Sequence, residues 1–533
     1  MRVDLSVPSQ LSWALLPDLV LAGGAMLLLV YAAWRPASAA HQRRVGVASI
    51  ALMLVTAAVV VYMAMSGVSS GPGPIAVDNF RWAADLIFLG GAILTVMLAM
   101  DYNERELITA PESHVLVLLA TSGMFLLSAA RDLTLVFLGI ELMSVATYVL
   151  VGINRRSARS AEGALKYFLL GAFSTAFLLY GMALVYGATG ATNFGVIAER
   201  LAADPARGGA LLKVGTALLV VGLGFKVAAA PFHMWAPDAY EGAPTPHSAF
   251  MAASIKAAAF AVFLRLFIEA FPSTYAQSWH EPIWWLAAVT MVVGNIAALS
   301  QKNIKRMLAY SSIAHAGYVL VAVVVGAGQV SQTGVSGSSA FLFYLVSYTL
   351  ATMGAFAIVA ALGSAGEPHL NIDDYSGLWT VRPGLTLAMS VFMLALLGFP
   401  VFGGMGFFAK WYMLQAALRG GAAPQTQLAV WLVFTSVLSA GYYLYVVTVM
   451  FVRPRAVDAP PLARVGGLTN AVIGLCVATI LFFGFMPTHM LRGVSRSALR
   501  GTPVPAAVPA PATPFGAPVP VAPPPAGIAT AAP

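Results

Sequence analysis

Charged side chains are scarce in this chain of 533 residues. Asp, Glu, Lys and Arg make up 9% of it, whereas 59% of its residues are hydrophobic. A soluble domain carries roughly 25% charged residues, because charge keeps a protein surface soluble. The scarcity excludes a large soluble protein. Apolar runs recur between Trp13 and Met486, and many approach the ~20 residues that a membrane-spanning helix needs. We therefore predict an all-α integral membrane protein.

Cysteine and nucleotide-binding motifs are also lacking. The single cysteine, Cys476, cannot form an internal disulfide or hold an iron–sulfur cluster alone. The sequence contains neither GxGxxG nor a P-loop. We expect no cofactor or metal ion in this chain. The net charge of +8 does not indicate a nucleic-acid partner, because the basic residues lie in short loops between apolar runs. The first apolar stretch has no basic flank before it, so we expect no cleavable signal peptide.

Fourteen apolar segments are candidate spans, and proline interrupts the seventh near Pro231 and the twelfth near Pro400. Proline removes a backbone donor and breaks a helix. Within lipid the freed backbone groups must be satisfied by protein or water, so broken helices tend to line hydrated cavities. The alternative is a simple packing kink. The candidate spans are 13–34, 45–66, 81–100, 113–130, 131–152, 163–187, 209–230, 244–270, 283–300, 305–327, 338–362, 383–418, 428–452 and 467–487.

Basic residues cluster in the loops after the first, fifth, ninth and thirteenth candidate spans, which lie on one side of a fourteen-span protein. The loops after the eighth and tenth spans, on the other side, contain no Lys or Arg. The positive-inside rule makes the basic side cytoplasmic, so both termini are expected outside. The clustered residues are Arg35, Arg43, Arg44, Arg155, Arg156, Arg159, Lys302, Lys305, Arg306, Arg453 and Arg455.

The chain also repeats itself weakly. The sequence YVLV stands at 148–151 and again at 318–321, and Gly-Phe stands at 224–225 and again at 398–399. The offsets are 170 and 174 residues, which correspond to five spans. An odd number of spans inverts the second copy in the membrane, and inverted repeats with broken helices are typical of secondary transporters. Chance similarity among apolar segments is the alternative.

Four ionisable side chains stand in the middle of candidate spans, namely Glu141, Lys226, Lys256 and Lys410. Such a group costs roughly 2.5–3.5 kcal/mol at the bilayer centre on insertion scales, so each is a functional hypothesis. Burial disfavours the charged form and pairing favours it, so a group balanced between them can load and release a proton. The alternative is a set of neutralised charges that only hold helices together. No carboxylate stands mid-span near Lys410 to balance it.

Other polar residues support weaker hypotheses. His315, in the tenth span, could relay protons, since histidine titrates near neutral pH, or it could be a hydrogen-bonded structural residue. We expect His233 and His247 near the cytoplasmic surface, without a metal role. Arg265 can snorkel toward the outer interface and is interpreted as structural. Lys166 is interpreted as an interfacial anchor, with a cytoplasmic proton entry as the alternative.

Four motifs resemble subunit N of the bacterial proton-pumping NADH:quinone oxidoreductase, respiratory complex I. The resemblance extends from about Pro17 to Met486. Sister subunits and related cation/proton antiporters share the core of the longest motif but usually continue differently through the eighth span, where this chain has Ser254–Lys256. Pro400-Val401 replaces the frequent Pro-Pro pair at the second break. The motifs are GFKVAAAPFHMWAPDAYEGAPTP at 224–246, KYFLLGAF at 166–173, NIKRMLAYSSIAHAGY at 303–318 and DDYSGL at 373–378.

The resemblance implies about fourteen transmembrane helices with two inverted five-helix repeats and two broken helices. It also implies that Glu141 and Lys226 form a carboxylate–lysine pair, that Lys256 is a connecting lysine and that Lys410 is the lysine of span twelve. The expected domains are a three-helix segment at 1–112, a first repeat at 113–270, a second repeat at 281–452, the last helix with its flanks at 453–500 and a disordered Pro/Ala-rich tail at 501–533.

The function implied by the resemblance is proton translocation in the membrane arm of complex I, driven by quinone reduction elsewhere. NADH, FMN, iron–sulfur clusters and quinone would be bound by other subunits. Partners would be the other membrane-arm subunits and the lipid bilayer of the bacterial inner membrane, with both termini periplasmic. The alternatives are a subunit of a multi-subunit sodium/proton antiporter, which needs no redox partner, and a scaffold whose buried charges only fix helix packing.

Overall fold

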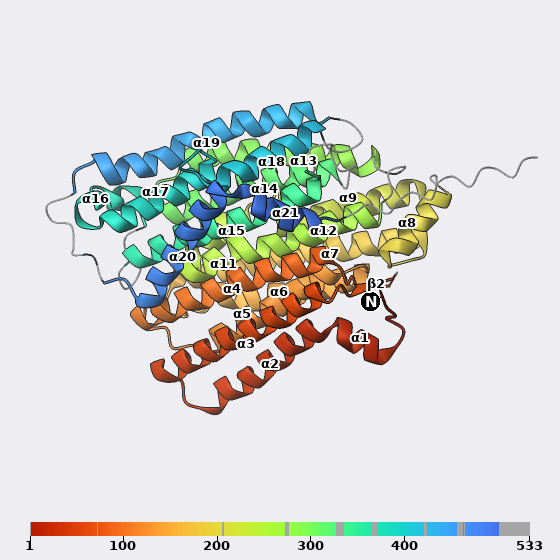
Figure 1. Ribbon diagram of the computed structural model, residues 1–533, viewed down its shortest axis with the longest axis horizontal. Helices are drawn as coiled ribbons and strands as arrows, with labels where there is room; N and C mark the ends of the chain where they lie inside the picture. Colours follow the sequence, from red (N-terminus) through yellow and green to blue (C-terminus); the bar gives the residue numbers. More distant parts are fainter. Residues whose placement is uncertain are drawn as a thin grey trace, which may run out of the picture. The chain divides into compact units, whose positions relative to one another are not determined.

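The described part of the chain is almost entirely helical (Figure 1). A computed structural model describes residues 2–71, 73–204, 207–271, 275, 277–326, 335–363, 370–419, 424–455, 462 and 464–499. These residues all belong to one structural unit, Met1–Gly501. The predicted disordered tail at 501–533 lies outside the described residues, so that prediction stays open.

Thirteen helical segments of the described chain are long and apolar enough to cross a membrane. Their lengths and compositions confirm the predicted multi-span fold. The segments are α2 (Leu16–Trp34), α3 (Ala39–Met65), α4 (Asn79–Arg105), α5 (Glu112–Ala129), α6 (Leu133–Val151), α7 (Ala158–Thr189), α9 (Gly209–Lys226), the continuous run Thr245–Glu269, α13 (Gln277–Leu299), α14 (Ile304–Val325), α15 (Gly337–Leu362), α19 (Thr426–Val452) and α20 (Gly467–Phe485).

One further span, the twelfth in chain order, consists of two shorter helices, α17 (Pro383–Leu397) and α18 (Met405–Arg419). The run Thr245–Glu269 is itself composed of α11 (Thr245–Phe250), the π-helical turn η1 (Met251–Ile255) and α12 (Lys256–Glu269). The remaining elements are short. They are α1 (Pro8–Ala14), α8 (Phe194–Ala203), α10 (Trp235–Gly242), the 3₁₀ turn η3 (Ile372–Tyr375), α16 (Leu378–Val381), α21 (Pro487–Arg496) and the parallel two-residue strands β1 (Arg2–Val3) and β2 (Ser69–Ser70).

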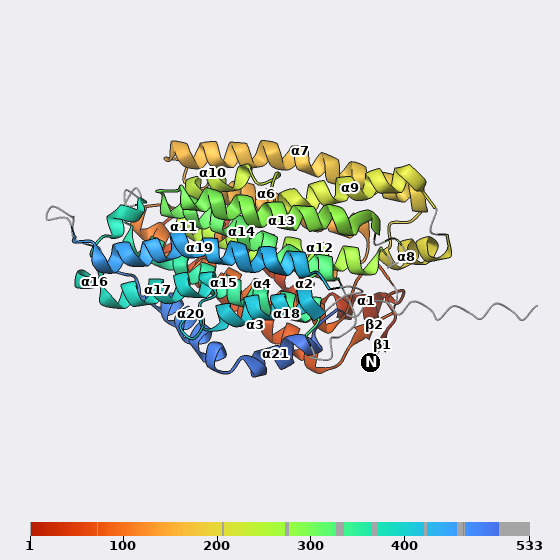
Figure 2. The same ribbon diagram turned by 90° about the horizontal axis from the view of Figure 1, so that it is seen from above.

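Three spans form the centre of the helix array, namely Thr245–Glu269, α14 and α15. In the most apolar stretch of each, 94%, 94% and 89% of the residues are buried, against 28% in the corresponding stretches of α2 and α20. Figure 1 places α15 and α11 between α19 on one side and α2 and α3 on the other. The turned view in Figure 2 places α7 along one edge of the array. Charged groups on the three central spans are therefore inside protein, whereas the outer faces of α2, α7 and α19 carry exposed apolar side chains suited to lipid.

Side-chain caps fix where several spans begin. Asp78 accepts a hydrogen bond from the Arg81 N–H at the start of α4, and Asn303 accepts from the N–H groups of Lys305 and Arg306 at the start of α14. The first backbone donors of a helix lack intrahelical partners, and short polar side chains satisfy them. These caps satisfy the first backbone donors of α4 and α14.

A largely buried ion network joins the start of α4, the connection between α5 and α6, and α12. The Arg265 guanidinium pairs with Asp78 at 2.8 Å and Glu269 at 2.7 Å, and Arg131 pairs with Glu269 at 2.8 Å. Burial acts to raise the pKa of Asp78, but the charges of Arg265 and Arg131 outweigh it and hold that pKa at about 2. The prediction that Arg265 snorkels was wrong, because its side chain is fully enclosed by this network.

Candidate functional site

The seventh span is broken after Lys226, the last residue of α9. Helix resumes at Trp235, and Ala228 in the break has a φ of +56°. The break keeps its backbone satisfied within protein: the Ala229 N–H donates to the Gly224 carbonyl at 2.8 Å, and the Ala230 N–H donates to the Thr290 hydroxyl at 3.0 Å. The predicted interruption near Pro231 is thus confirmed, and it leaves Lys226 at a helix C-terminus, where a cation is favoured.

Lys226 is buried and its Nζ donates to the Ser144 hydroxyl on α6 at 2.8 Å. A second hydroxyl, that of Tyr148 one turn further along α6, lies 3.4 Å away. Lys226 forms no ion pair with any described residue, and the polar contacts of its ammonium group are these two hydroxyls. Polar contact of this kind offsets part of the cost of placing an amine inside a membrane protein.

Glu141 stands three residues before Ser144 on the same face of α6, because residues three apart in a helix are neighbours. Its carboxylate accepts a hydrogen bond from the Thr175 hydroxyl on α7 at 2.9 Å. The side chain is half-buried, and within the described residues it makes no ion pair with Lys226. The structure therefore does not bring the two charges into direct contact: Lys226 donates to Ser144, and Glu141 accepts from Thr175.

Lys256 follows directly on the π-helical turn Met251–Ile255 in the centre of the array. Its Nζ donates to the Ser312 carbonyl at 2.9 Å and to the Ser312 hydroxyl at 2.5 Å, both on α14. A π turn shifts the register of a helix locally and is frequent at functional sites. Lys256 is thus fixed to α14 through one residue that supplies a backbone and a side-chain acceptor.

The twelfth span is broken between Leu397 and Met405. Gly398, Val401 and Gly404 all have positive φ, at +78°, +68° and +50°. Val401 is strained there, since a β-branched residue rarely adopts a left-handed conformation. The break near Pro400 is confirmed, and the Pro400-Val401 departure from the family pattern coincides with this strained residue.

Lys410 lies on α18 and reaches back across this break. Its Nζ donates at 2.9 Å to the carbonyl of Leu397, which is the last residue of α17. The same ammonium lies 4.6 Å from the centre of the Tyr318 ring on α14. The C-terminal carbonyls of a helix carry partial negative charge, and an aromatic face attracts a cation. The sequence left the counter-charge of Lys410 open, and in the structure a helix end and an aromatic ring lie beside its ammonium group.

His315 stands on α14 between Ser312 and Tyr318. Its Nδ1 is 2.8 Å from the Tyr344 hydroxyl on α15, and its Nε2 is 3.1 Å from the Tyr443 hydroxyl on α19. The Tyr443 hydroxyl also hydrogen-bonds the Ser311 hydroxyl. Both ring nitrogens are thus in use, which fits either a relay or a structural histidine.

One helix, α14, connects the two lysines of the central region. Ser312 holds Lys256, and Tyr318, less than two turns further, lies against Lys410. The Tyr318 hydroxyl accepts from the Asn295 amide at 3.0 Å. Hydroxyl groups can accept and donate a proton at once, so the polar face of α14 is suited to carry protons between the two lysines.

Sequence reasoning missed the neutral members of the site, because isolated hydroxyls in apolar helices look like ordinary packing residues. The available signal was spacing. Ser144 stands one turn from Glu141, and Ser312 stands one turn from His315. Residues three or four apart on a helix share a face, so each hydroxyl lies on the same face as an ionisable residue and can accept from a lysine of a facing helix.

The other predicted polar residues lie outside this central region. Lys166 is partly exposed and pairs with Asp238 on α10 at 2.8 Å, and Arg306 pairs with the same carboxylate at 2.7 Å. Burial acts to raise the pKa of Asp238, but these two hydrogen-bonded cations keep it below its usual value. The side chain of His247 is buried, whereas that of His233 is half-buried, and their expected position near the cytoplasmic surface stays a prediction.

No group of three metal-ligating side chains gathers anywhere in the part of the chain that the structure describes. The central site contains amines, hydroxyls, one imidazole and one carboxylate, with carbonyls from helix ends. This donor set suits proton transfer rather than metal binding, because amines and hydroxyls are weak ligands for the metals that proteins hold.

Known proteins resemble this chain in sequence. A family model described as "NADH:quinone oxidoreductase/Mrp antiporter, TM" matches residues 130–439. A Gemmatimonas aurantiaca protein named NADH-quinone oxidoreductase subunit N is 52% identical over 499 residues, covering 92% of this chain and 94% of that protein. Subunit N 2 of Roseiflexus castenholzii is 40% identical over 504 residues, covering 94% of this chain and 97% of that protein.

Solved structures show the same fold. A chain of respiratory complex I from Thermus thermophilus with bound aureothin superimposes with a TM-score of 0.72 at 35% identity, covering 90% of this chain and 99% of that chain. A chain of the Mrp complex from Dietzia sp. DQ12-45-1b gives a TM-score of 0.75 at 20% identity, covering 90% of this chain and 97% of that chain. The second likeness is one of fold alone.

Proposed function

This chain belongs to the family of NADH-quinone oxidoreductase subunits N, and we propose that it translocates protons in the membrane arm of that complex through Lys226, Lys256 and Lys410. The observation that carries the proposal is shared by the three lysines. Each is buried, and the Nζ of each donates to a neutral acceptor: a hydroxyl, a carbonyl, or both.

Neutral acceptors distinguish proton sites from structural charges. A carboxylate partner at hydrogen-bond distance stabilises the ammonium form strongly. A hydroxyl or carbonyl can be retained by a neutral amine, which still has N–H groups to donate. The buried side chain of Arg265 is by contrast paired with two carboxylates. The lysines are thus arranged to change charge, and Arg265 is arranged to keep it.

The two helix breaks support a repeated architecture for this path. The first break follows Lys226 and the second follows Leu397, close to the offset of the sequence repeats. Helices in corresponding positions also pack alike: α5 on α6 and α13 on α14, then α6 on α7 and α14 on α15. We therefore retain 113–270 and 281–452 as two inverted repeats, each with one broken span.

The cofactors belong elsewhere in this proposal. Flavin, iron–sulfur clusters and the quinone site would lie in other subunits, and this chain would receive energy as a change in electrostatics or conformation. It would reside in the bacterial inner membrane, with both termini periplasmic. A cysteine introduced before α1, beside Asp4, should react with an impermeant thiol reagent in intact cells. Reaction restricted to inverted vesicles would refute this orientation.

A sodium/proton antiporter is the alternative, because a chain of an Mrp complex shares the fold. Deletion of the gene distinguishes the two functions. Loss of NADH-driven proton pumping with sodium tolerance intact supports the complex I function. Loss of sodium tolerance with NADH-driven pumping intact would support the antiporter.

A further inference from the structure

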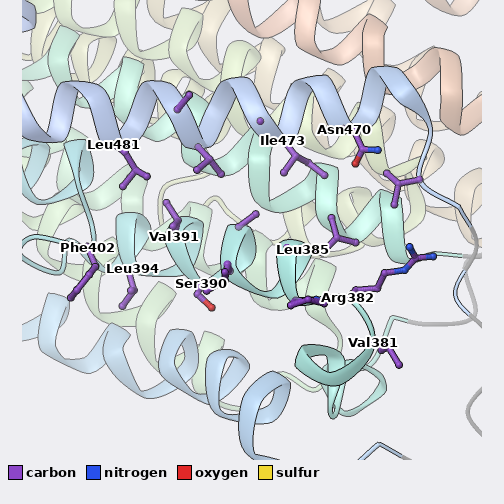
Figure 3. A pocket seen from close by; sticks show the side chains of 18 of the residues that line it. Val381, Arg382, Leu385, Ser390, Val391, Leu394, Phe402, Asn470, Ile473 and Leu481 are labelled. Atoms are coloured by element: carbon purple, nitrogen blue, oxygen red, sulfur yellow. The ribbon is translucent and has the colours of Figure 1, made fainter.

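Two regions outside the three lysine sites differ in polarity. The groove between α17 and α20 is walled mainly by aliphatic side chains, among them Leu385, Val391 and Leu394 (Figure 3). The helices α3, α4 and α5 pack on one another, α11 packs on α4, and two histidines are enclosed there. His114 is the third residue of α5 and His247 is the third residue of α11, and they are 0% and 1% exposed. This second region therefore buries two titratable groups that the three lysine sites do not use.

The two buried imidazoles have polar atoms to spare. None of the four ring nitrogens of His114 and His247 has a hydrogen-bond partner among the described residues. The two side chains lie close enough for their charges to interact. A neutral imidazole has one N–H donor and one bare nitrogen that accepts, and a buried polar atom without a partner costs free energy. Buried polar atoms are paired with protein groups or with ordered water, so this pair is suited to hold water.

The surroundings of His114 supply a further polar partner. A Cβ placed on Gly46 of α3 would lie 3.3 Å from His114 Nε2 and 2.9 Å from Met100 Sδ, so both side chains lie against this glycine. Asn103, one turn beyond Met100 on α4, has a buried amide oxygen without a partner among the described residues. Its Nδ2 donates at 3.4 Å to the hydroxyl of Ser113, the residue before His114. A buried water needs two to four polar partners, and the two imidazoles and this amide can supply them.

Polar side chains continue from this pair toward Lys256. Ser254 follows His247 by two helical turns, which is roughly 10 Å along the helix. The hydroxyls of Ser254 on η1 and Thr349 on α15 are buried and have no partner within the part of the chain that the structure describes. A Cβ placed on Gly91 of α4 would lie 2.0 Å from Ser254 Oγ and 3.5 Å from Thr349 Cγ2. The two side chains therefore meet beside α4, deeper in the array than the histidines.

Tyr348 connects this row of hydroxyls to the acceptor of Lys256. The Tyr348 hydroxyl interacts with Thr352 on α15 and with Ser312 on α14. Thr352 stands three residues after Thr349 and thus shares its face of α15. Ser312 accepts from Lys256 Nζ through its carbonyl at 2.9 Å. Because a hydroxyl can accept one proton and donate another, these groups with water between them form a continuous route for a proton.

We propose that His114 and His247 hold water between them and pass protons from the membrane face where α5 and α11 begin toward Lys256. Ser254 and Thr349 carry the route onward. A neutral imidazole accepts a proton on its bare nitrogen and releases the proton of its N–H nitrogen to the next water, so one proton enters and one leaves. This inference rests on the proposed function, because the route supplies one of its three lysines. The route lies where the N-terminal helices meet the first repeat, apart from both helix breaks.

Apolar substitution of each histidine tests the relay in the intact complex. His114→Leu and His247→Leu remove buried polar atoms without protein partners, so histidines that only fill space could be replaced without loss of activity. We expect each variant to slow NADH-driven proton pumping at least about tenfold, with assembly and soluble-acceptor NADH oxidation unchanged. The matched control is His41→Leu, a buried histidine on α3 whose Nε2 is 3.2 Å from the Ala32 carbonyl, and it should pump at the wild-type rate.

Lys256→Ala separates a failure of the relay from a failure of the proposed function. Loss of pumping in Lys256→Ala, with wild-type pumping in assembled His114→Leu and His247→Leu complexes, would overturn the relay and leave the proposed function in place. Wild-type pumping in an assembled Lys256→Ala complex would refute the role of that lysine, and with it the destination of the route.

Synchrotron radiolysis of the wild-type complex tests for the water itself and needs no variant. Hydroxyl radicals formed from waters inside a protein oxidise the side chains beside them, and peptide mass spectrometry locates the products. We expect oxidation of His114, His247 or Met100, while Met53, which is fully buried on α3, stays unmodified. The absence of oxidation at all three positions, at a dose that oxidises the exposed Met486, would overturn the proposal.

Discussion

The two broken spans hold their lysines in different ways. Lys226, at the end of α9, donates to the Ser144 hydroxyl of another span at 2.8 Å. Lys410, on α18, donates to the Leu397 carbonyl of its own broken span at 2.9 Å. One substitution removes a hydroxyl, but no substitution removes a backbone carbonyl. The first site thus depends on neighbouring side chains, and the second depends on the geometry of the break itself.

Lys226→Ala should have the largest effect. It removes the only cation that contacts Ser144 among the described residues. We expect NADH-driven proton pumping to fall at least about tenfold, or ~1.4 kcal/mol of transition-state stabilisation, while the complex still assembles. Pumping in inverted vesicles and a native gel measure the two quantities.

Lys213→Ala is the matched control, because Lys213 lies on the same helix with an exposed side chain. It should pump at the wild-type rate. Wild-type pumping by a fully assembled Lys226→Ala complex would count against the role of this lysine.

Lys410→Arg should be nearly as damaging as Lys410→Met. Arginine can keep the charge at the Leu397 carbonyl, but it cannot release a proton, since its pKa stays above ~12. We therefore expect both variants to lose most NADH-driven acidification, and Lys302→Arg, at an exposed loop position, to lose none. A Lys410→Arg complex that pumps normally would show that this site needs only a fixed positive charge.

Removing the hydroxyl partners should sharpen the contrast between side-chain and backbone acceptors. Ser144→Ala deprives Lys226 of its 2.8 Å partner, whereas Ser312→Ala leaves Lys256 with the Ser312 carbonyl at 2.9 Å. A hydrogen bond to a charged group contributes about 1.5–3 kcal/mol. We expect Ser144→Ala to slow pumping by about tenfold and Ser312→Ala to slow it less. The reverse order would contradict this interpretation.

The sequence predicted the helices and the charges better than it predicted their partners. Apolar length and proline position locate the spans and the breaks at Pro231 and Pro400, because lipid tolerates few other patterns. The sequence did not predict that Glu141 is half-buried and apart from Lys226. Contact between two helices depends on how far each is rotated about its axis and on the depth of each residue. The Leu397 carbonyl could not be read from side-chain patterns at all, because it is a backbone group exposed by the break.

Tyr443→Phe should have a moderate effect on proton pumping, confined to the second half of the proposed proton path. It removes the hydroxyl beside His315 Nε2 and Ser311, but His315 keeps the Tyr344 hydroxyl at 2.8 Å. We expect slower pumping, with a smaller loss than for either lysine variant. Tyr445→Phe, on the same helix with an exposed ring, is the control. Identical pumping by both variants would make His315 structural rather than a relay.

Asp78→Asn should have the smallest effect on pumping and a clear effect on stability. Asp78 pairs with Arg265 and Arg131, and removing one partner of a buried pair is strongly destabilising. The pKa of Asp78 is held at about 2. The ionised carboxylate therefore contributes fully to stability at any pH above the pKa that it has in the unfolded chain. This contribution is lost only as pH falls toward 2. The loss in Tm should therefore be constant from about pH 5 to about pH 8.

Asp373→Asn, in an exposed pair with Arg453, is the comparison for Asp78→Asn. A surface pair contributes about 0–1 kcal/mol, so its Tm should change little. A loss in Tm for Asp78→Asn that varies across neutral pH would contradict the assignment of its charge state.

The most direct test of the central claim is NADH-driven proton pumping by a complex that carries Lys226→Ala and Lys410→Met together. NADH oxidation with a soluble artificial acceptor, measured on the same preparation, reports the electron-transfer subunits independently of this chain. We expect pumping to be lost while soluble-acceptor activity and assembly match wild type. Proton pumping at the wild-type rate in this assembled double variant would contradict it.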